Sequence, residues 1–326
     1  MGFLNKLFST LIPDRGRTPA LLAQWLGMPE SDLRSWLDGP PNPGYSYRRF
    51  TVPKRRGGER IIDAPSDDLK VLQKRIYNKL LRRLPAHPAV TGFVQGRSIV
   101  DNARPHSNQA VVINLDLADF FPSISAEQVW KAWRGIGWNK ESARILTNIC
   151  TCEKRLPQGA PTSPALSNLV CRKLDVRLTA YTQGKRINGH YTRYADDLTF
   201  SFEALGKNKR RRKKPEGAPE RKQILAASRT VLRGIRGIVE DEGFRIQKKK
   251  RVRIQRAHQR QTATGLVVNR AVNLPREVRR RIRAMQHRMK HRKLQPGQQQ
   301  ELSGWEALQR MILTQRNKPE DSLPMP

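Results

Sequence analysis

Two aspartates stand side by side, Asp196 and Asp197, in the stretch YTRYADDLTFSF at residues 191–202. Apolar and polar residues alternate after the pair as in a half-buried strand, which predicts that the acids lie at the tip of a hairpin. A third acid, Asp116, falls near the end of the buried-strand pattern VVINLDL at residues 111–117. Neighbouring carboxylates repel each other unless a cation lies between them. Carboxylates on adjacent strands can hold two divalent cations about 4 Å apart, which is the arrangement that phosphoryl transfer to a nucleotide needs.

The composition predicts a polyanionic partner. The 326-residue chain has 63 Lys and Arg against 28 Asp and Glu, a formal net charge of +35. Nucleic acid is favoured over a membrane surface because basic residues occur along the whole chain and no segment has the ~20 apolar residues of a spanning helix. The alternative is a basic surface that is merely solvated. The N-terminus has no secretory-signal pattern, and three cysteines without a CxxC pair indicate reduced thiols in a cytosolic protein rather than a zinc site.

The periodicities predict an α+β chain with an all-helical end. Residues 18–38 indicate two short helices, which could imitate a helix-turn-helix but more simply pack against the rest of the chain. Two strands flank the basic Gly-Gly turn at Arg55 to Glu59. Residues 203–222 have almost no large apolar side chain and are predicted to be a disordered basic loop. Further helices are predicted at Asp67 to about Leu84, 126–149, 163–182, 224–239 and in the basic tail from Pro275 onward.

Considered alone, the Asp pair would predict only an ordinary exposed turn. Three segments make a functional role the better interpretation: INLDLADFFPSI (113–124), LPQGAPTSPALSN (156–168) and YADD (194–197). In their order and spacing they resemble the three palm motifs of reverse transcriptases, and the resemblance extends from about residue 46 to 270. It implies that the catalytic acids, which bind two Mg²⁺ ions, are Asp116, Asp196 and Asp197.

The resemblance also implies the right-hand polymerase fold, in which fingers and a helical thumb flank a palm with an antiparallel sheet. The expected parts are an N-terminal helical appendage at 1–44, fingers at 45–110, a palm at 111–270 with an interleaved fingers segment and the basic insertion 203–222, and a thumb at 271–326.

Two of the resembling motifs suggest substrate contacts. Phe121 falls where reverse transcriptases have the bulky steric gate that rejects a ribonucleotide 2′-OH. The alternative is a core aromatic, and Phe120 shows that not every Phe here can be a gate. The segment around Gln158 and Gly159 has a backbone that can approach the incoming nucleotide and template closely.

Basic residues are the expected triphosphate contacts. Arg60 resembles the fingers arginine that closes on the triphosphate, since a guanidinium fork suits phosphate oxygens; Lys54 is a weaker candidate. Lys250 best matches the lysine near the leaving pyrophosphate, and the adjacent Lys248 and Lys249 leave that register open.

Two further stretches resemble the marks of retron reverse transcriptases. DNARPH (101–106) contains an NAxxH motif at Asn102 and His106, and ATGLVVN (263–269) resembles a VTG motif with Ala263 in place of Val. The resemblance implies RNA contacts by Asn102, His106, Thr264 and Gly265. His106 could equally be a structural histidine that is satisfied in the core.

A retron enzyme is expected to have several partners. It would copy part of a cognate noncoding RNA from dNTPs into multicopy single-stranded DNA, beginning at the 2′-OH of a guanosine and leaving a branched RNA–DNA product. We expect it in the bacterial cytoplasm, with no membrane contact and in an antiphage defence system. The sequence ends at Pro326 without an apparent effector or RNase H domain, so a separate effector protein and a host RNase H are expected.

The basic tail is predicted to bind this RNA through phosphates and shape, because side chains cannot enter the deep major groove of A-form RNA. The alternative is simple packing of the thumb, but Ile282, Met285 and Met289 make only a narrow apolar stripe. The expected contacts are Arg279, Arg280, Arg283 and Arg288, together with Arg281, His287, Lys290 and Arg292.

Two rival interpretations remain open. One is a group II intron or diversity-generating reverse transcriptase, although the first normally has an extension for which too little chain follows residue 270, and the second usually departs from the Gln158-Gly159 pair. The other is a noncatalytic RNA-binding protein on the same fold, against which the three intact aspartates speak.

Overall fold

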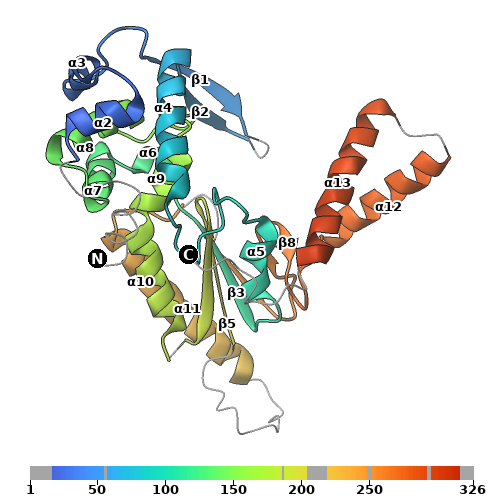
Figure 1. The fold of residues 1–326 in the computed structure, drawn as a ribbon. Helices are drawn as coiled ribbons and strands as arrows, with labels where there is room; N and C mark the ends of the chain where they lie inside the picture. Colours follow the sequence, from blue (N-terminus) through green and yellow to red (C-terminus); the bar gives the residue numbers. More distant parts are fainter. Residues whose placement is uncertain are drawn as a thin grey trace. The chain divides into compact units, whose positions relative to one another are not determined.

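The computed structural model describes residues 17–54, 57–185, 187–203, 219–247, 252–291 and 295–315. The chain forms two compact units, coloured along the sequence in Figure 1. The first consists of Met1–Ala86 and Asp119–Arg172, and the second of His87–Ala118 and Lys173–Pro326. Both contain helices and antiparallel strand pairs, which agrees with the predicted α+β class. Each expected boundary, at 44, 110 and 270, falls within one of these two units.

The first unit combines a helical core with a two-stranded hairpin. Its largest fully buried side chains include Trp36, Trp133 and Trp138. The hairpin turns at Gly57 and Gly58, whose φ values of 85° and 82° are those that glycine adopts without strain, as the sequence predicted. The elements are α2 (Pro19–Leu26), α3 (Glu30–Arg34), η1 (Ser35–Leu37), β1 (Tyr47–Pro53), β2 (Glu59–Pro65), α4 (Asp67–Lys79), η2 (Leu81–Arg83), α6 (Phe120–Ser123), α7 (Ala126–Gly135), α8 (Lys140–Cys150) and α9 (Ser163–Val170).

The N-terminal helices are integral to this unit. The Asn148 side-chain amide of α8 donates to the carbonyls of Trp36 and Leu37 at 2.7 and 3.1 Å. Lys79, at the end of α4, donates to the Trp25 carbonyl at 2.6 Å. The segment 18–38 therefore packs against its own unit, which is the simpler of the two roles that its sequence allowed.

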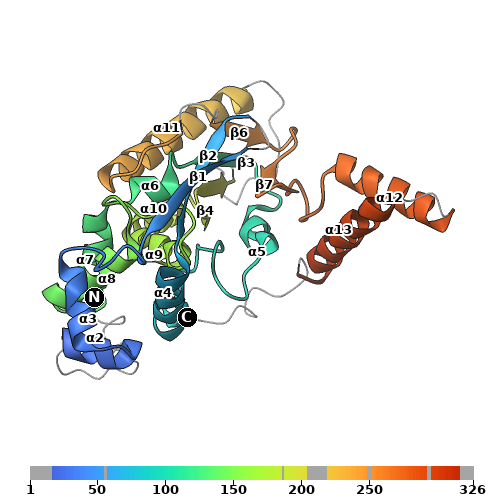
Figure 2. The ribbon, with the colours of Figure 1, turned by 90° about the horizontal axis from the view of Figure 1, so that it is seen from above.

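The second unit is built on a sheet. Among the described residues, four strands pair in the order β4-β5-β3-β6, all antiparallel. The strands are β3 (Val111–Asp116), β4 (Gly189–Tyr194), β5 (Asp197–Phe202) and β6 (Arg253–Arg256). Their register sets Ile113 opposite Phe200 on one face and Asn114 opposite Thr199 on the other. Helices α10 (Arg172–Gln183) and α11 (Pro219–Asp241) cover the apolar face, while α5 (Ile99–Ala103) and η3 (Arg104–His106) lie on the polar face (Figures 1 and 2).

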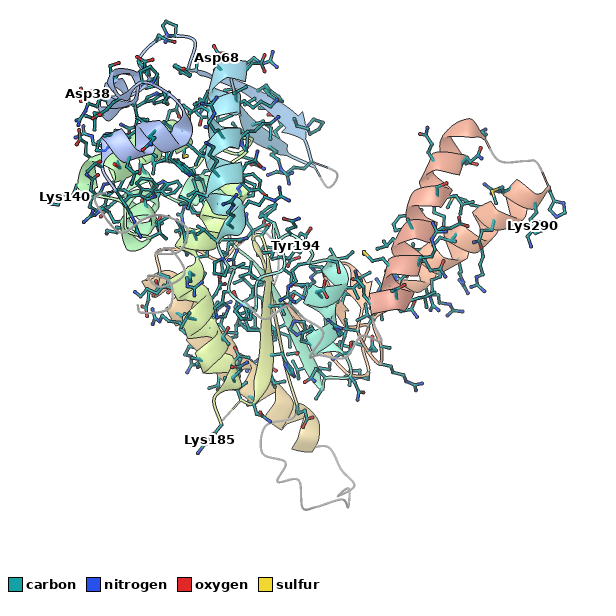
Figure 3. The ribbon with its side chains drawn as sticks, in the orientation of Figure 1. Asp38, Asp68, Lys140, Lys185, Tyr194 and Lys290 are labelled. Carbon is teal, nitrogen blue, oxygen red and sulfur yellow. The ribbon has the colours of Figure 1, made fainter. Side chains whose placement is uncertain are left out.

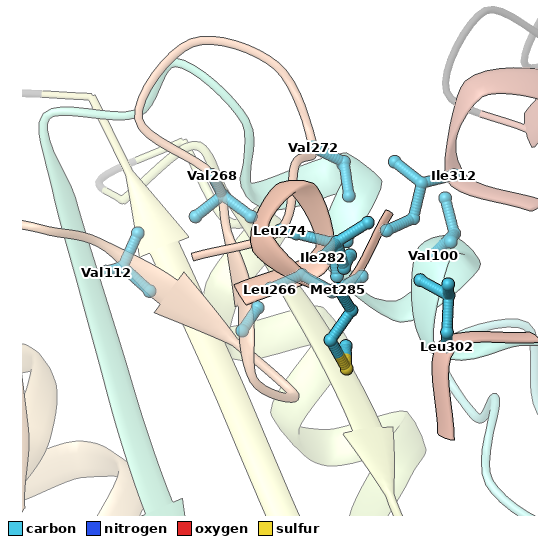
Figure 4. Close-up of a cluster of buried hydrophobic side chains, with 12 residues drawn as sticks. Val100, Val112, Leu266, Val268, Val272, Leu274, Ile282, Met285, Leu302 and Ile312 are labelled. Atoms are coloured by element: carbon cyan, nitrogen blue, oxygen red, sulfur yellow. The ribbon is translucent and has the colours of Figure 1, made fainter. Parts of the chain in front are cut away.

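The two C-terminal helices complete the second unit. Helices α12 (Arg276–Lys290) and α13 (Pro296–Gln315) follow the small hairpin of β7 (Thr262–Ala263) and β8 (Leu266–Val267). Side chains from these elements and from α5 form one buried cluster, shown in Figure 4, that includes Val100, Leu266, Ile282, Met285 and Leu302. This shared core explains why the two helices belong to the second unit.

Some helices differ from the ranges that the sequence predicted. The predicted helices 126–149 and 163–182 are each divided: residues 136–139 separate α7 from α8, and Cys171 separates α9 from α10. The predicted helix that starts at Asp67 ends at Lys79 and is followed by the short helix η2. Most of the predicted basic loop, residues 204–218, lies outside the described residues.

No helix in the described ranges is both long and apolar enough to cross a bilayer.

Candidate active site

Asp116 and Asp197 lie directly opposite each other. They are cross-strand partners at the end of the β3–β5 ladder. The hairpin of β4 and β5 pairs Tyr194 with Asp197, so its turn consists of Ala195 and Asp196; Figure 3 labels Tyr194 where the turn begins. Directly opposed residues of an antiparallel pair present their side chains on the same face, with Cβ atoms about 4.5–5.5 Å apart. The fold thus brings the three predicted acids to one end of the sheet.

Backbone hydrogen bonds fix this end of the sheet on two sides. The Leu117 amide donates to the Asp196 carbonyl at 2.9 Å. The Gln247 amide donates to the Asp116 carbonyl at 2.8 Å, and the Ala118 amide donates to the Arg245 carbonyl at 2.7 Å. These main-chain bonds hold the strand ends on which the acids lie.

The turn itself has an unusual backbone. Ala195 has a φ of 57°, in the left-handed region that favours glycine. A non-glycine residue there costs on the order of 1–3 kcal/mol and persists only when its surroundings hold it. Strain of this kind is typical of functional sites.

The donor set fits a hard divalent cation whose remaining ligands come from elsewhere. Asp116, Asp196 and Asp197 are half-buried and supply only carboxylate oxygens. In the described part of the chain, no three His, Cys, Asp or Glu side chains form a ready-made metal cage. Mg²⁺ is commonly bound by one or two carboxylates plus substrate phosphates, so an incomplete protein cage is compatible with a nucleotide-dependent site.

The predicted gate and nucleotide-loop residues belong to the first unit. Phe120 is 6% exposed, whereas Phe121 is half-buried on α6. The Gln158 carbonyl accepts a hydrogen bond from the Asp63 amide of β2 at 2.9 Å. Gly159 has a φ of 139°, and a Cβ there would lie 2.8 Å from the Asp63 carbonyl oxygen. The loop therefore lies against β2, and this close approach requires glycine.

Of the predicted triphosphate contacts, the structure describes Arg60 and the weaker candidate Lys54, which is exposed just after β1. Arg60 is exposed on β2, the same strand that the Gln158 loop contacts. Lys250 lies outside the described residues.

The NAxxH residues are buried rather than exposed to a ligand. Asn102 and His106 are both 0% exposed. The Asn102 Oδ1 atom accepts from the Thr91 hydroxyl at 2.8 Å. The His106 ring bonds to the hydroxyls of Ser201 and Thr192 at 2.7 and 2.8 Å. Direct RNA contact by either side chain would require this unit to open, so the structure gives them the structural role that was the alternative for His106.

Burial also sets the protonation state of His106. Removal from water, with a smaller contribution from the nearby His190, lowers the pKa of His106 to about 3. The ring is therefore neutral at physiological pH, with one nitrogen as donor and the other as acceptor for its two hydroxyl partners.

The predicted VTG-like motif is a tight hairpin turn. Thr264 and Gly265 are the two residues between β7 and β8, with φ values of 45° and 83°. Positive φ at both central positions defines a type I′ turn, in which glycine is favoured. The Thr264 hydroxyl donates to the Ile99 carbonyl at 3.2 Å, which links the turn to α5.

The predicted RNA-binding arginines line the outside of α12. Arg279, Arg280, Arg283 and Arg288 are exposed, while Ile282 and Met285 are buried on the opposite stripe. Arg281 differs because it pairs with Glu301 of α13 at 2.8 Å. Lys290 lies at the far end of the helix (Figure 3). Arg292 lies outside the described residues.

One buried ion pair was not predicted from the sequence. Arg193 and Asp175 are both 0% exposed and form an ion pair of 2.7 Å beneath the hairpin of the acids. A signal was present, because Arg193 shares the apolar face of β4 with Tyr191, where a charged residue needs a buried partner.

The fold and these motifs define a reverse transcriptase, and comparisons with known proteins agree. The family described as "Reverse transcriptase (RNA-dependent DNA polymerase)" matches residues 52–264. The chain is 38% identical over 307 residues to the retron Mx162 reverse transcriptase of Myxococcus xanthus, covering 86% of this chain and 60% of that protein. It is 36% identical over 312 residues to the retron Mx65 enzyme of the same organism, covering 87% and 68%. It is 35% identical over 246 residues to the retron Ec86 enzyme of Escherichia coli, covering 74% and 70%.

The chain belongs to the retron reverse transcriptases, a group of RNA-directed DNA polymerases. This confirms the family that its motifs resembled.

Proposed function

We propose that this enzyme copies a cognate noncoding RNA into multicopy single-stranded DNA, starting from the 2′-OH of a guanosine and leaving a branched RNA–DNA product. The main support for polymerase chemistry is the cross-strand pairing of Asp116 with Asp197, with Asp196 in the adjoining turn. Similarity to retron reverse transcriptases supports a noncoding RNA template over the templates of group II intron and diversity-generating enzymes.

In the proposed mechanism the three acids bind two Mg²⁺ ions together with the triphosphate. When bound, the metal supplies the positive charge that favours ionisation of the attacking hydroxyl and stabilises the leaving pyrophosphate. Asp116 and Asp197 orient their carboxylates from rigid strands, so little reorganisation is needed during the reaction.

Other residues would select and bind the nucleotide. Phe121 excludes a ribose 2′-OH by its bulk, and Gln158 with Gly159 forms the backbone surface beside the incoming dNTP. Arg60 binds triphosphate oxygens with its guanidinium fork, and Lys250 serves near the leaving pyrophosphate.

The thumb would hold the RNA. The exposed arginines of α12 suit phosphate oxygens, and shape rather than sequence governs recognition of A-form RNA. The turn of Thr264 and Gly265 is also proposed to lie at the RNA. A separate effector protein, a host RNase H and a role in antiphage defence in the bacterial cytoplasm complete the proposal, by analogy with retron enzymes.

The test of the chemistry is Asp197→Asn, assayed with Mg²⁺, dNTPs and a primed RNA template. We expect DNA synthesis to fall by at least about 10³-fold, because a metal ligand is lost, while RNA retention stays unchanged. Asp38→Asn is the matched control, since the Asp38 side chain is 96% exposed. Wild-type synthesis by Asp197→Asn would contradict the proposal and favour a noncatalytic RNA-binding protein.

The test of the retron product is to sequence the nucleic acid that co-purifies with the protein from its native host. A DNA joined to RNA by a 2′,5′ bond, sensitive to a debranching enzyme, is expected. Only linear cDNA would favour one of the other reverse transcriptase groups.

A further inference from the structure

We infer that Arg193 and Asp175 are positioning residues that fix the turn carrying the catalytic acids. This inference rests on the proposed role of Asp196 and Asp197. The Arg193 guanidinium donates from Nε to Asp175 Oδ1 at 2.8 Å and from Nη2 to Oδ2 at 2.7 Å, a two-pronged contact. Its remaining nitrogen, Nη1, donates to the carbonyl of Ala195 at 3.2 Å. One side chain thus connects helix α10 to the turn between β4 and β5.

The stability of the fold alone does not require such a pair. Both side chains are 0% exposed, and a buried ion pair can usually be replaced by apolar residues of similar volume without loss of stability. What an apolar pair could not provide is a donor to the Ala195 carbonyl. The two-pronged contact with Asp175 leaves that third donor fixed in direction, which is a property of the planar guanidinium.

The carboxylate of Asp175 is itself rigidly oriented. The Tyr191 hydroxyl donates to Asp175 Oδ1 at 2.8 Å, in addition to the two bonds from Arg193. The Tyr191 ring stacks on Phe200 with 4.9 Å between centroids. Asp175 is therefore a fixed anchor on α10, and Arg193 transmits its position to the turn.

The backbone of Arg193 is held as well. Its amide donates to the Ala89 carbonyl at 2.8 Å, and its carbonyl accepts from the Thr91 amide at 2.9 Å. Since β4 cannot shift along this neighbour without breaking both bonds, the guanidinium starts from a fixed position.

The strained residue is the one that receives the bond. Ala195 has the φ of 57° noted above, and it directly precedes Asp196 and Asp197. A turn in a costly conformation relaxes unless its surroundings prevent it. The bond from Arg193 opposes that relaxation, and the consequence is a defined position for the two acids.

The test is a triple variant, Tyr191→Phe/Asp175→Leu/Arg193→Met, which removes the buried polar groups but keeps their approximate volume. We expect a folded protein with a thermal midpoint near that of the wild type. We expect kcat to fall about 10²-fold, as misplacement by about 1 Å can cause. The Mg²⁺ concentration for half-maximal rate should rise, while the KM for dNTP measured at saturating Mg²⁺ stays unchanged.

Hydrogen exchange gives a readout that needs neither metal nor substrate. The Leu117 amide, which donates to the Asp196 carbonyl, should exchange faster in the triple variant than in the wild type. Arg193→Lys should lie between the two, because an ammonium group can pair with Asp175 but lacks the fork that reaches Ala195.

Arg177→Met is the matched control. Arg177 lies on the same helix as Asp175 but pairs with Glu242 and Asp241 of the α11 region at 2.6 and 2.7 Å. The Arg177→Met variant should have the same kcat and the same Mg²⁺ dependence as the wild type. A folded triple variant with wild-type kcat, Mg²⁺ response and Leu117 exchange would overturn the inference. If Asp197→Asn also retained activity, the proposed function would fail instead.

Discussion

Gly92 lies against the backbone of Ala195 so closely that a Cβ on Gly92 would be 2.5 Å from the Ala195 amide nitrogen. The same Cβ would be 3.0 Å from two backbone atoms of Tyr194. Since the neighbouring atoms are main-chain atoms of the turn, they cannot move aside as a flexible side chain could. The segment before α5 is thus a backbone support for the turn that precedes the proposed catalytic acids Asp196 and Asp197.

Gly92→Ala should therefore displace the turn. We expect kcat for DNA synthesis to fall about 10-fold to 10²-fold, because the acids that follow Ala195 lose their position. Gly237→Ala is the control, since a Cβ at this exposed position of α11 meets nothing within 4 Å. The control should keep full activity and gain about 0.5–1 kcal/mol of stability. Unchanged kcat in a folded Gly92→Ala protein would show that the support is unnecessary.

His106 makes the stability of the enzyme depend on pH. Its folded-state pKa of about 3 lies below the ordinary value of 6.5, so the unfolded chain binds more protons between these two values. Stability is then complete above pH 6.5 and is lost as the pH falls towards 3. The loss attributable to this residue should be about 2 kcal/mol at pH 5.

Urea unfolding of the wild type and of His106→Gln between pH 7 and 4 measures this effect. The variant should start less stable and depend less on pH, because it has no ring to protonate. His258→Gln, which changes an exposed histidine, should keep the wild-type pH dependence. Parallel curves for the wild type and His106→Gln would contradict the assignment.

The turn of Thr264 and Gly265 should contribute to the stability of the folded protein through its backbone conformation. Gly265→Ala places a Cβ at a φ of 83°, which should destabilise the protein by about 1–2 kcal/mol. Gly304→Ala, at an exposed position of α13 with nothing within 4 Å of a Cβ, should be neutral or stabilising. Thermal unfolding measures both. RNA affinity measured well below the midpoint tests whether Gly265 also contacts RNA, since a purely structural residue would leave it unchanged.

Much of the site was predictable because it depends on local patterns. Strand periodicity placed Asp116 at the end of one strand and Asp197 at the start of another, and antiparallel pairing of two such strands makes them partners. The Gly-Gly turn of the first unit was predictable for the same reason. Each of these features is encoded within a few residues of sequence.

Features that depend on contacts between distant segments were not predictable. Arg193 was recognisable as a charge on an apolar face, but nothing in the sequence indicated that Asp175 of α10 is its partner. The approach of Gly92 to Ala195 depends on how a separate segment runs beside β4. The burial of His106 under two strand hydroxyls likewise follows from packing, which its motif does not contain.

Phe121 should control sugar selection. Phe121→Val removes the ring that is proposed to meet a 2′-OH, so ribonucleotide incorporation should rise by at least about 10-fold relative to dNTP incorporation. The dNTP rate is the internal reference. Phe120→Leu is a further control, because Phe120 is a core residue with 6% exposure, and its loss should lower stability without changing the ratio. If Phe121→Val left the ratio of ribonucleotide to dNTP incorporation unchanged, Phe121 would be a core aromatic and not a steric gate.

The exposed arginines of α12 should determine the salt dependence of RNA binding. Each phosphate contact adds about 0.7–0.9 to the slope of log affinity against log salt concentration. The quadruple change to Gln at four exposed positions should reduce that slope by about 3 and weaken binding of all RNA sequences alike. The positions are Arg279, Arg280, Arg283 and Arg288.

Arg281→Gln is the matched control on the same helix, because Arg281 already pairs with Glu301 at 2.8 Å and has less to offer a phosphate. Its slope should stay close to that of the wild type. Filter binding at several salt concentrations, with circular dichroism to check the helix content, measures both variants. If the quadruple variant kept the wild-type slope, α12 would serve only to pack the thumb through Ile282 and Met285, and the RNA contacts would have to lie elsewhere on the basic surface.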